Sequence, residues 1–560
     1  MSNDYSKYYK KSKTVSTKDN KKTPLEATST RDNRDVAEAQ KVDKAIFGIL
    51  LAILGILPLL TRTKVIDFTG PQITNNLSIG SGTVADVFTY YKFIFLIIAT
   101  SILIILFLYR AYGIGIPIKK SFINIPLAIL ALFVALSALL APFKSLALIG
   151  MYNRHEGALT YLCYFTLFFI AANLTYTKKM LHNVIYALYP IVIVNTILGL
   201  LGFYGVDLIK SSFARAILLP KGITEEMIGA GSQFITTINH GNYVSGISVV
   251  LIVIFMMMFI LDKNKIRQAA NTILAIFSFA MLLSSLSRSG FLTFLLMLPL
   301  LALILLVFKE RLKNYSKFGT QLGLFAIVFF IMASHNPLVW DESMGTLIKS
   351  NPFNNQESST VLDATAIKKL SLRGFDNLFE SKVYAQSENT GQNSEEPFML
   401  PTLPEYGTAP GTGRLYIWEK ALELIKDKPI TGYGLDTFSY HFPQNDPGKI
   451  SGLASHTVIV DKPHNVYINM LYGAGMIAFI TLLLLFGTAL FKGLKQFFGN
   501  RFEYSEEKGF IFISIFFGIT AYLIQGLFND SIIGSAPIFW VLFGVYVAIM
   551  KEIKLDIKEN

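Results

Sequence analysis

The chain has 560 residues, of which 52% are hydrophobic and only 16% are charged, and its mean hydropathy is +0.47. An ordinary soluble domain carries about 25% charged residues, so this composition excludes a soluble multidomain enzyme and predicts a membrane protein. The net charge of +12 does not indicate a nucleic-acid partner, because membrane proteins gather Lys and Arg beside anionic lipids on the cytoplasmic side. The single cysteine, Cys163, lies in an apolar run, which excludes an intramolecular disulfide and a CxxC metal or redox site.

The N-terminal residues 1–44 are polar and have no hydrophobic periodicity. They predict a disordered cytoplasmic tail. The first apolar run, near 45–61, lies too far from the start for a signal peptide and lacks a small-residue cleavage pattern. We therefore expect it to be a retained membrane helix.

About twelve apolar runs have the length needed to span a bilayer. Nine lie in a predicted membrane domain at 45–334, three lie at 466–550, and a short cytoplasmic tail at 551–560 follows. The runs after the first are 93–109, 123–141, 158–174, 183–205, 243–261, 270–286, 290–308, 318–334, 466–491, 509–527 and 536–550. The fold class predicted is all-α and polytopic, although the shorter runs span only if neighbours or flanking residues extend them.

The short connections reveal the orientation of the helices. Lys and Arg concentrate in every connection that is cytoplasmic if the N-terminus is cytoplasmic, for example at Lys263, Lys265 and Arg267, and they are sparse in the alternate connections. This bias follows the positive-inside rule. It predicts a multi-pass membrane protein with both termini in the cytoplasm.

One large segment, 335–465, lies between the ninth and tenth predicted helices and is external on this topology. Its first part, 335–410, is polar and low in complexity, which predicts a flexible insert. Its second part, 411–465, begins with a predicted helix over Arg414–Lys428, with Thr412 as a candidate cap. The apolar residues at helical spacing are Leu415, Trp418, Leu422 and Ile425. They predict an amphipathic helix on the outer membrane surface; the alternative is a helix that only covers the top of the bundle.

Six of the seven histidines are external on this topology, namely His155, His240, His335, His441, His456 and His464. None stands in HExxH or another close ligand spacing, so no metal site is expected. The chain has no GxxxxGK[ST] motif, and its inner connections are too short for a nucleotide-binding domain. An ATP-driven pump is therefore disfavoured.

Three external arginines are candidates for binding an anion. Arg288, in "SLSRSGF", lies between two apolar runs, where a guanidinium is costly unless it meets an anion or lines a cavity. Arg414 stands at the start of the predicted surface helix, where backbone N–H groups favour an anion, and Arg215 lies in an outer connection. Together they could clamp a lipid-linked diphosphate through bidentate hydrogen bonds. The alternative for Arg288 and Arg215 is an interfacial side chain that reaches for water.

His464, in "DKPHNVYINMLYGAGM", directly precedes the tenth predicted helix, which holds it at the outer membrane surface. An imidazole with a pKa near 6.5 suits a general base that removes a proton from a hydroxyl at neutral pH. A lone surface histidine is more often only solvated.

Taken together, these blocks resemble the O-antigen ligase and polymerase family of bacterial membrane glycosyltransferases. The closest similarity is in 411–478, with "GTGRLYIWEKALELIKDKPITGYGLDTF" and "PHNVYINMLYGAGMIA". "TTINHGNYVSG", "SLSRSG" and "ADVFTYYK" resemble further family motifs in the same order. The chain departs from the family at Ala474 and Ala478, and at Gln233, where an Arg is common. This last departure leaves the second phosphate-binding Arg open, with Arg215 as the candidate.

The resemblance implies that a glycan moves from a polyprenyl (undecaprenyl) diphosphate donor to an acceptor hydroxyl on the outer face of the membrane. It implies His464 as the general base and Arg288 and Arg414 as catalytic cations, with inversion at the anomeric carbon and no cofactor or metal. Substrate-binding roles follow for Arg215, Asn465, Trp418 and Asn242.

Three classes of acceptor stay open: a cell-surface lipid or polymer, such as a glycolipid or a cell-wall polymer, for a ligase, another lipid-linked glycan for a polymerase, and Ser or Thr of a protein for an O-oligosaccharyltransferase. A lipid-linked-glycan flippase or transporter is a rival from another class. The sequence shows none of the internal repeats that are common in transporters.

Overall fold

The computed structural model describes residues 25–70, 72–74, 77–78, 82–206, 211–220, 236–306, 308, 311–346, 348, 351–353, 413–446, 448–449, 453, 459–498 and 507–559. The N-terminal helices are α2 (Leu25–Gly55), α3 (Tyr90–Leu108), α4 (Asn124–Leu140), α5 (Lys144–Ile149), α6 (Ala158–Asn173), α7 (Lys178–Tyr186), α8 (Tyr189–Phe203) and α9 (Ser212–Leu218). The central helices are α10 (Gly241–Leu261), α11 (Lys265–Ser284), α12 (Arg288–Leu305), α13 (Arg311–His335) and α14 (Leu338–Asp341). The C-terminal helices are α16 (Arg414–Asp427), α17 (Phe438–His441), α19 (Val466–Phe498), α20 (Glu507–Gln525) and α21 (Ala536–Glu559).

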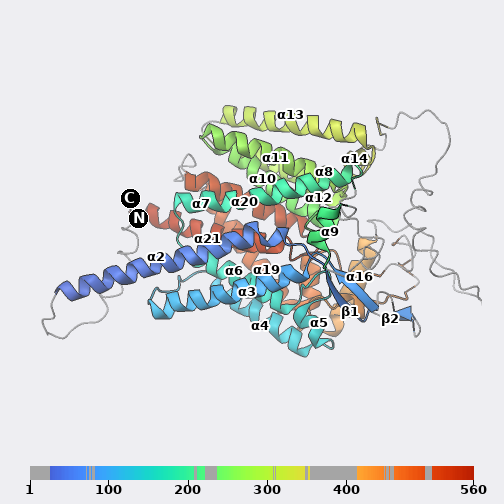
Figure 1. Cartoon of the computed structure of the whole chain (residues 1–560), viewed down its shortest axis with the longest axis horizontal. Coiled ribbons are helices and arrows are strands. Elements are labelled where there is room, and N and C mark those ends of the chain that lie inside the picture. The colour runs from blue at the N-terminus through green and yellow to red at the C-terminus, as the bar shows by residue number, and fades with distance from the viewer. Residues whose placement is uncertain are drawn as a thin grey trace, which may run out of the picture.

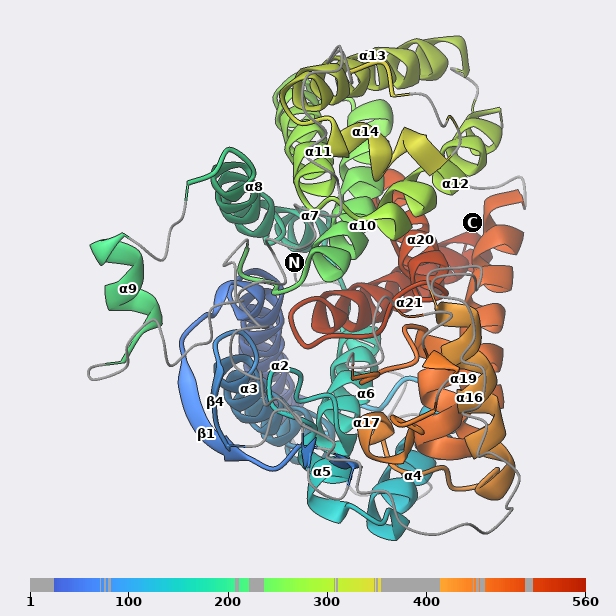
Figure 2. The same ribbon diagram turned by 90° about the vertical axis from the view of Figure 1, so that its right-hand side faces the viewer.

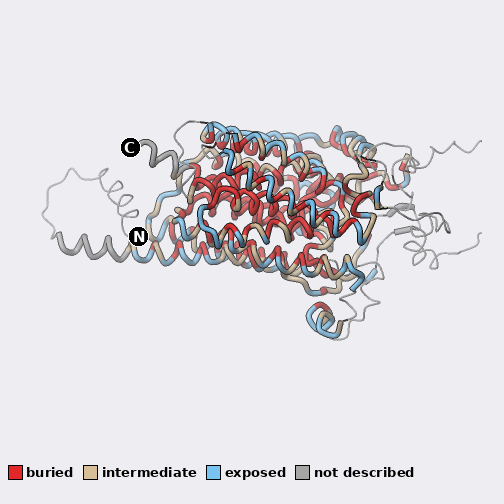
Figure 3. Tube along the Cα trace, turned by 90° about the horizontal axis from the view of Figure 1, so that it is seen from above, coloured by how far each residue is buried: buried red, intermediate tan, exposed pale blue. Residues whose placement is uncertain are grey.

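The long helices lie side by side in one bundle (Figure 1). The start of α2 and the end of α21 lie at one end of the bundle, and α9, α14, α16 and the strands lie at the other (Figure 1). We call this second end the loop end. Buried residues run along the interior and exposed ones along the periphery (Figure 3), as expected for helices that share a core.

Among the described residues, nine helices are long and apolar enough to cross a membrane. Each of the twelve apolar runs predicted from sequence lies largely in helix, but 124–140, 158–173 and 536–550 form shorter apolar helices. The predicted helical, multi-pass fold is confirmed, and the count of twelve spans stays a prediction.

The core centres on α10, whose apolar residues are buried on all sides. A helix that is hydrophobic all round belongs in the middle of a bundle. It packs mainly against α11 and α20, while α6 packs against α21 and α19 packs against α4. Helices far apart in the sequence therefore meet, and their loops converge at the loop end.

Two predicted boundaries are wrong. Helix α2 begins at Leu25, so residues 25–44 are helical and not part of a disordered tail. Its polar half is rich in Ala, Glu and Lys, which favour helix, and buried Asp43 forms an ion pair of 2.6 Å with Arg110. The predicted flexible insert is also ordered at its start, because α14 follows α13 and Trp340 packs against Phe329 and Phe353. Residues 354–412 of that insert lie outside the described residues.

Two small antiparallel sheets at the loop end add to the predicted all-α architecture. Strand β1 (Lys64–Phe68) pairs with β4 (Gly82–Asp86), and β2 (Gln72–Thr74) pairs with β3 (Leu77–Ser78). In the larger sheet Lys64 lies opposite Asp86 and Phe68 lies opposite Gly82. Asp86 is thereby held at the beginning of α3.

Helix α19 is kinked at Gly475, where φ is +81° and ψ is 176°. A turn over residues 429–434 fits against this kink: the Met476 N–H donates to Pro429 O at 2.7 Å, and the Tyr433 and Gly434 N–H groups donate to Tyr472 O and Gly473 O at 3.0 Å. A Cβ at Gly475 would lie 2.0 Å from Ile430 O, so only glycine fits there.

Helix α16 and the turn enclose a second, smaller hydrophobic core with the start of α19. Its buried members are Ile417, Ala421, Ile425, Tyr433, Phe438, Phe442, Val460, Leu471 and Tyr472. This core fixes the segments on both sides of His464. Figure 2, which views the loop end, shows α16 lying along α19.

Candidate functional site

His464 lies at the loop end, directly before α19, with a left-handed backbone conformation at φ +52°. Its Nδ1 lies 2.8 Å from Oδ2 of Asp530, which belongs to the connection between α20 and α21. The Asp530 side chain is only 1% exposed. The other carboxylate oxygen, Oδ1, is buried and has no hydrogen-bond partner among the described residues.

The carboxylate of Asp530 sets the protonation of His464. Burial by itself lowers the pKa of His464, but the negative charge and hydrogen bond of Asp530 outweigh it, so the pKa lies above its usual value. In return the pKa of Asp530 lies below its usual value despite burial, because His464 faces it. When Nδ1 donates its proton to Asp530, Nε2 keeps a lone pair, which is the arrangement a general base requires.

Arg414 opens α16 within electrostatic range of both members of this pair. It is partly buried, and it forms no ion pair with another described residue. The cap of the helix is Gly413, with φ +78°, and no side chain caps it. Glycine adopts this left-handed conformation at little cost, and Thr412, the predicted cap, lies outside the described residues.

The buried face of α16 differs from the predicted stripe. Ile417 and Ala421 are buried together with Ile425, whereas Leu415 and Leu422 are 50% and 47% exposed. These buried residues pack on the start of α19 and the turn, and the contact of Leu415 and Leu422 with the outer membrane surface stays a prediction. Trp418 points into this contact, where its Nε1–H donates to Pro463 O at 2.7 Å. Trp418 therefore supports the segment that carries His464.

Arg288 opens α12 and forms a bidentate ion pair with Glu342. Its Nε lies 2.7 Å from Oε2 and its Nη2 lies 3.0 Å from Oε1. The Arg288 side chain is 51% exposed, so an anion that approaches from the loop end can compete with Glu342.

The serines on either side of Arg288 belong to a polar network that reaches the His464–Asp530 pair. Ser287 Oγ donates to Asn242 Oδ1 at 2.8 Å. Asn529, which precedes Asp530, donates from Nδ2 to Ser289 Oγ at 3.3 Å and to Asn242 O at 3.0 Å. The network thus connects α10, α12 and the α20–α21 connection.

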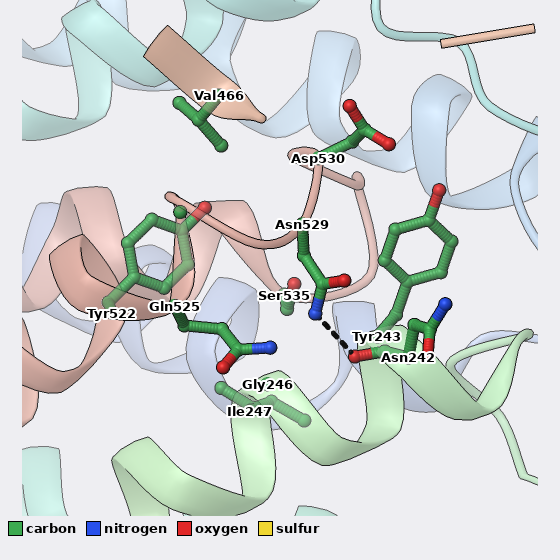
Figure 4. A pocket seen from close by; sticks show the side chains of 11 residues that line it. Asn242, Tyr243, Gly246, Ile247, Val466, Tyr522, Gln525, Asn529, Asp530 and Ser535 are labelled. Carbon is green, nitrogen blue, oxygen red and sulfur yellow. Dashed lines mark hydrogen bonds between the residues drawn. The ribbon is translucent and has the colours of Figure 1, made fainter. Parts of the chain in front are cut away.

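A pocket opens beside this network (Figure 4). It is lined by Asn242, Tyr243, Gly246, Ile247, Val466, Tyr522, Gln525, Gly526, Asn529, Asp530 and Ser535. In Figure 4 the amide of Asn529 points toward the backbone oxygen of Asn242. Asn242 therefore lines this pocket, its carbonyl and side chain both take part in the protein's own hydrogen bonds, and its role in binding substrate stays a prediction.

The remaining two candidates, Asn465 and Arg215, differ in where they lie relative to His464. Asn465 caps α19, because its Oδ1 accepts from the N–H groups of Tyr467 and Ile468 at 2.9 and 3.1 Å, and its Nδ2 donates to Leu527 O at 3.1 Å. Arg215 lies on α9, which stands apart from α16 and α19 in Figure 2. The structure does not bring Arg215 next to His464.

Sequence reasoning did not identify Asp530 or the charged groups around it. Buried Lys462 donates to Ser531 O at 3.3 Å and supplies positive charge close to Asp530. Arg154 forms ion pairs with Asp436 and Asp461. A usable signal was present, since Asp530 is an acidic residue between two long apolar runs on the predicted external side. No group of three or more metal-ligating side chains occurs among the described residues.

Strained backbone gathers at the same end of the molecule. The non-glycine residues with positive φ in the described part of the chain are Asn153, His155, Asn239, Leu286, Asp436 and His464. All of them belong to connections at the loop end. Such conformations persist only where surrounding structure enforces them, and they are typical of functional sites.

These features define a multi-pass helical membrane protein with a histidine–carboxylate pair and nearby arginines at one end of its bundle. The O-antigen ligase family model matches residues 273–483. Over these residues the predicted resemblance to the O-antigen ligase family of membrane glycosyltransferases is confirmed. Arg288, Arg414 and His464 lie inside the matched residues, and Asp530 lies outside them. No curated protein matches the chain.

Proposed function

We propose that this protein transfers a glycan from a polyprenyl diphosphate donor to an acceptor hydroxyl at the outer face of the bacterial cytoplasmic membrane. Both termini are then cytoplasmic and the loop end is external. The observation that carries the proposal is the His464–Asp530 pair with Arg414 beside it in an O-antigen ligase domain.

The acceptor hydroxyl loses its proton to His464 Nε2. Asp530 holds the imidazole through Nδ1 and stabilises the imidazolium that forms. The resulting alkoxide attacks the anomeric carbon opposite the diphosphate, so that the carbon–oxygen bond to the acceptor forms as the bond to the diphosphate breaks. This single displacement inverts the anomeric configuration.

The diphosphate is an activated leaving group, so no nucleotide is needed to drive transfer. Arg414 stabilises the charge that develops on it, and Arg288 joins after exchanging Glu342 for a phosphate oxygen. Arg215 is too remote in this structure to complete the clamp, and Asn242 and the neighbouring pocket are available to the sugar.

The first test is deletion of the gene with mass analysis of surface glycans and of lipid-linked donor. Unattached full-length glycan on the lipid supports a ligase, loss of long chains only supports a polymerase, and unglycosylated secreted protein supports a protein transferase. Unchanged surface glycans without accumulated donor would contradict every form of the proposal.

The second test complements the deletion with His464→Gln or Arg414→Met. We expect His464→Gln to lower transfer by about 10²- to 10⁴-fold, the usual contribution of a general base. A flippase does not need this imidazole, so transfer at the normal rate by His464→Gln would favour transport. Protein level and melting temperature in detergent serve as the control for folding.

A further inference from the structure

The connection between α5 and α6, residues 150–157, is an unusually tight loop. Its ends touch, since a Cβ at Gly150 would lie 2.5 Å from the backbone nitrogen of Glu156. Asn153 and His155 inside it have φ values of +60° and +53°. Left-handed conformations at non-glycine residues cost free energy, so other contacts must hold this loop in place.

One set of contacts comes from the N-terminal part of the chain. Asp86 Oδ2 accepts from the Asn153 N–H at 2.9 Å and from the Thr89 hydroxyl at 2.6 Å. His155 Nδ1 lies 3.0 Å from the same hydroxyl oxygen and 3.3 Å from Asp86. The loop is therefore anchored to β4 and the start of α3.

The other set comes from Arg154, at the tip of the loop, which is only 6% exposed. Its Nε lies 2.8 Å from Oδ1 of Asp436, and its Nη1 forms an ion pair with Oδ2 of Asp461. Asp436 in turn accepts from the Met151 N–H at 2.7 Å through Oδ2. Two sides of the guanidinium are thus occupied by carboxylates of the protein itself.

These two carboxylates belong to the segments that build the candidate site. Asp436 follows the Gly432–Gly434 turn that fits against the kink of α19, and its own φ is +64°. Asp461 stands three positions before His464. Arg154 therefore ties a rigid, anchored loop to both segments whose relative position determines where the imidazole lies.

We propose that Arg154 is a positioning residue for His464: it fixes the segment that carries the base and neutralises the carboxylate of Asp461 beside it. Arg154 is not a ligand of the diphosphate, because its guanidinium is already paired with two carboxylates in a buried place. The inference rests on the proposed function, in which His464 is the base.

The charges around His464 make the inference measurable. The groups that act on it are Asp530, Asp461, Arg414 and His240. Asp461 raises the pKa of His464, and this effect is moderated while Arg154 neutralises Asp461. Removal of Arg154 therefore raises the pKa of His464 further, whereas removal of the Asp461 charge lowers it. The acidic limb of the pH–rate profile moves in the same direction as the pKa of His464, because transfer needs the unprotonated imidazole.

The experiment compares Arg154→Met, Arg154→Lys and Asp461→Asn, each purified as the full chain. The probe is a detergent extract of membranes from the deletion strain, which contains the native donor and acceptor, with glycan transfer followed by mass analysis. We expect Arg154→Met to lower kcat by about tenfold to a hundredfold, the effect of misplacing a reacting group, and to move the acidic limb to higher pH. Arg154→Lys keeps the positive charge. Its acidic limb should therefore return toward that of the parent chain, whereas its kcat should recover less.

Asp461→Asn keeps the inference testable even if Arg154→Met does not fold. The Asp461 side chain is 43% exposed, so its replacement should disturb the structure less. It should move the acidic limb to lower pH, opposite to Arg154→Met. Arg267→Met is the matched control, because Arg267 also pairs with two carboxylates, Asp262 and Glu507, at the other end of the bundle. Its pH profile should equal that of the parent.

The outcomes separate the inference from the proposed function. An inactive His464→Gln together with unshifted profiles for Arg154→Met and Asp461→Asn overturns the positioning role and leaves the function intact. A fully active His464→Gln overturns the proposed function itself. Opposite shifts in the two variants, with an unshifted Arg267→Met control, support the inference.

Discussion

At the scale of single residues, His464 is distinguished as the candidate base by the contact of its Nδ1 with Asp530. A solvated histidine near a membrane has both nitrogens free to exchange protons with water, whereas Nδ1 of His464 is engaged by the buried carboxylate of Asp530. The imidazole is still 35% exposed, which leaves Nε2 within reach of an acceptor. A fixed, partly exposed imidazole is better suited to take a proton than a mobile one.

Replacement of Asp530 by Asn tests this argument. Without the carboxylate, burial dominates and the pKa of His464 falls below its usual value, so the acidic limb of the kcat profile moves to lower pH. The rate at the plateau falls by about 10²- to 10⁴-fold, because the amide stabilises neither the required tautomer nor the imidazolium. Asp530→Glu, which keeps the charge, is the control. An unchanged profile in Asp530→Asn would show that the pair has no catalytic role.

Arg288 provides a second residue-scale prediction through its partner Glu342. Since the pair is exposed, its contribution is at most about 1 kcal/mol. Glu342→Gln should therefore lower the apparent KM for donor by up to about fivefold, with little change in kcat. The apparent KM is measured by titrating each variant with lipid extract from the deletion strain. Glu423→Gln, which breaks the exposed pair with Lys420 on α16, should leave KM unchanged. A higher KM in Glu342→Gln would mean that Glu342 orients Arg288 for the substrate.

At the scale of elements, the site depends on a break inside a helix. The kink of α19 exposes backbone groups that the 429–434 turn satisfies, and Ser137 of α4 donates to Gly473 O on the same stretch. The 429–434 turn also packs with α16 against the start of α19. The helix interruption thus converts a membrane span into a support for Arg414 and His464.

Gly475→Ala should therefore destabilise the protein strongly. The left-handed backbone costs about 1–2 kcal/mol with a Cβ, and the clash with Ile430 O adds to it, so we expect a lower melting temperature in detergent together with loss of transfer. Gly487→Ala in the same helix is the matched control. A Cβ there meets nothing within 4 Å, and the change should be neutral or stabilising by up to about 1 kcal/mol. Equal melting temperatures for the two variants would argue against the kink as a support.

The sequence predicted the parts of this architecture that depend on local patterns. Apolar length predicted the helices, and the block 411–478 that resembles the O-antigen ligase family pointed to the segments of the candidate site. The position of Asp530 between two apolar runs was a usable signal, but its pairing with His464 and the role of Arg154 could not be predicted, because both depend on contacts across the bundle, 66 positions from His464 in the case of Asp530. The face by which α16 packs on α19 was not predicted for the same reason, since Ile417 and Ala421 are buried by residues distant in the sequence.

At the scale of the whole molecule, the bundle separates charge by end. The end that contains the start of α2 and the end of α21 carries ion pairs that join helix ends, such as Arg267 with Asp262 and Lys508 with Glu552. The loop end carries the strained connections and the candidate site. In the proposed function, the lipid-linked donor reaches this site from the plane of the membrane, and its polar part stays outside the hydrocarbon region.

The sidedness of the bundle can be tested directly, because its single cysteine is buried with only 8% exposure. Lys144→Cys places a thiol at the exposed start of α5 on the loop end, and Lys263→Cys places one in the exposed connection between α10 and α11 at the opposite end. We expect a membrane-impermeant maleimide to label Lys144→Cys in intact cells and to label Lys263→Cys only after permeabilisation, because Lys-rich connections stay cytoplasmic. The parent chain, which retains Cys163, should stay unlabelled in both conditions. The reverse pattern would place His464 in the cytoplasm, away from any acceptor on the cell surface, and the transferase would then have to act before its glycan is exported.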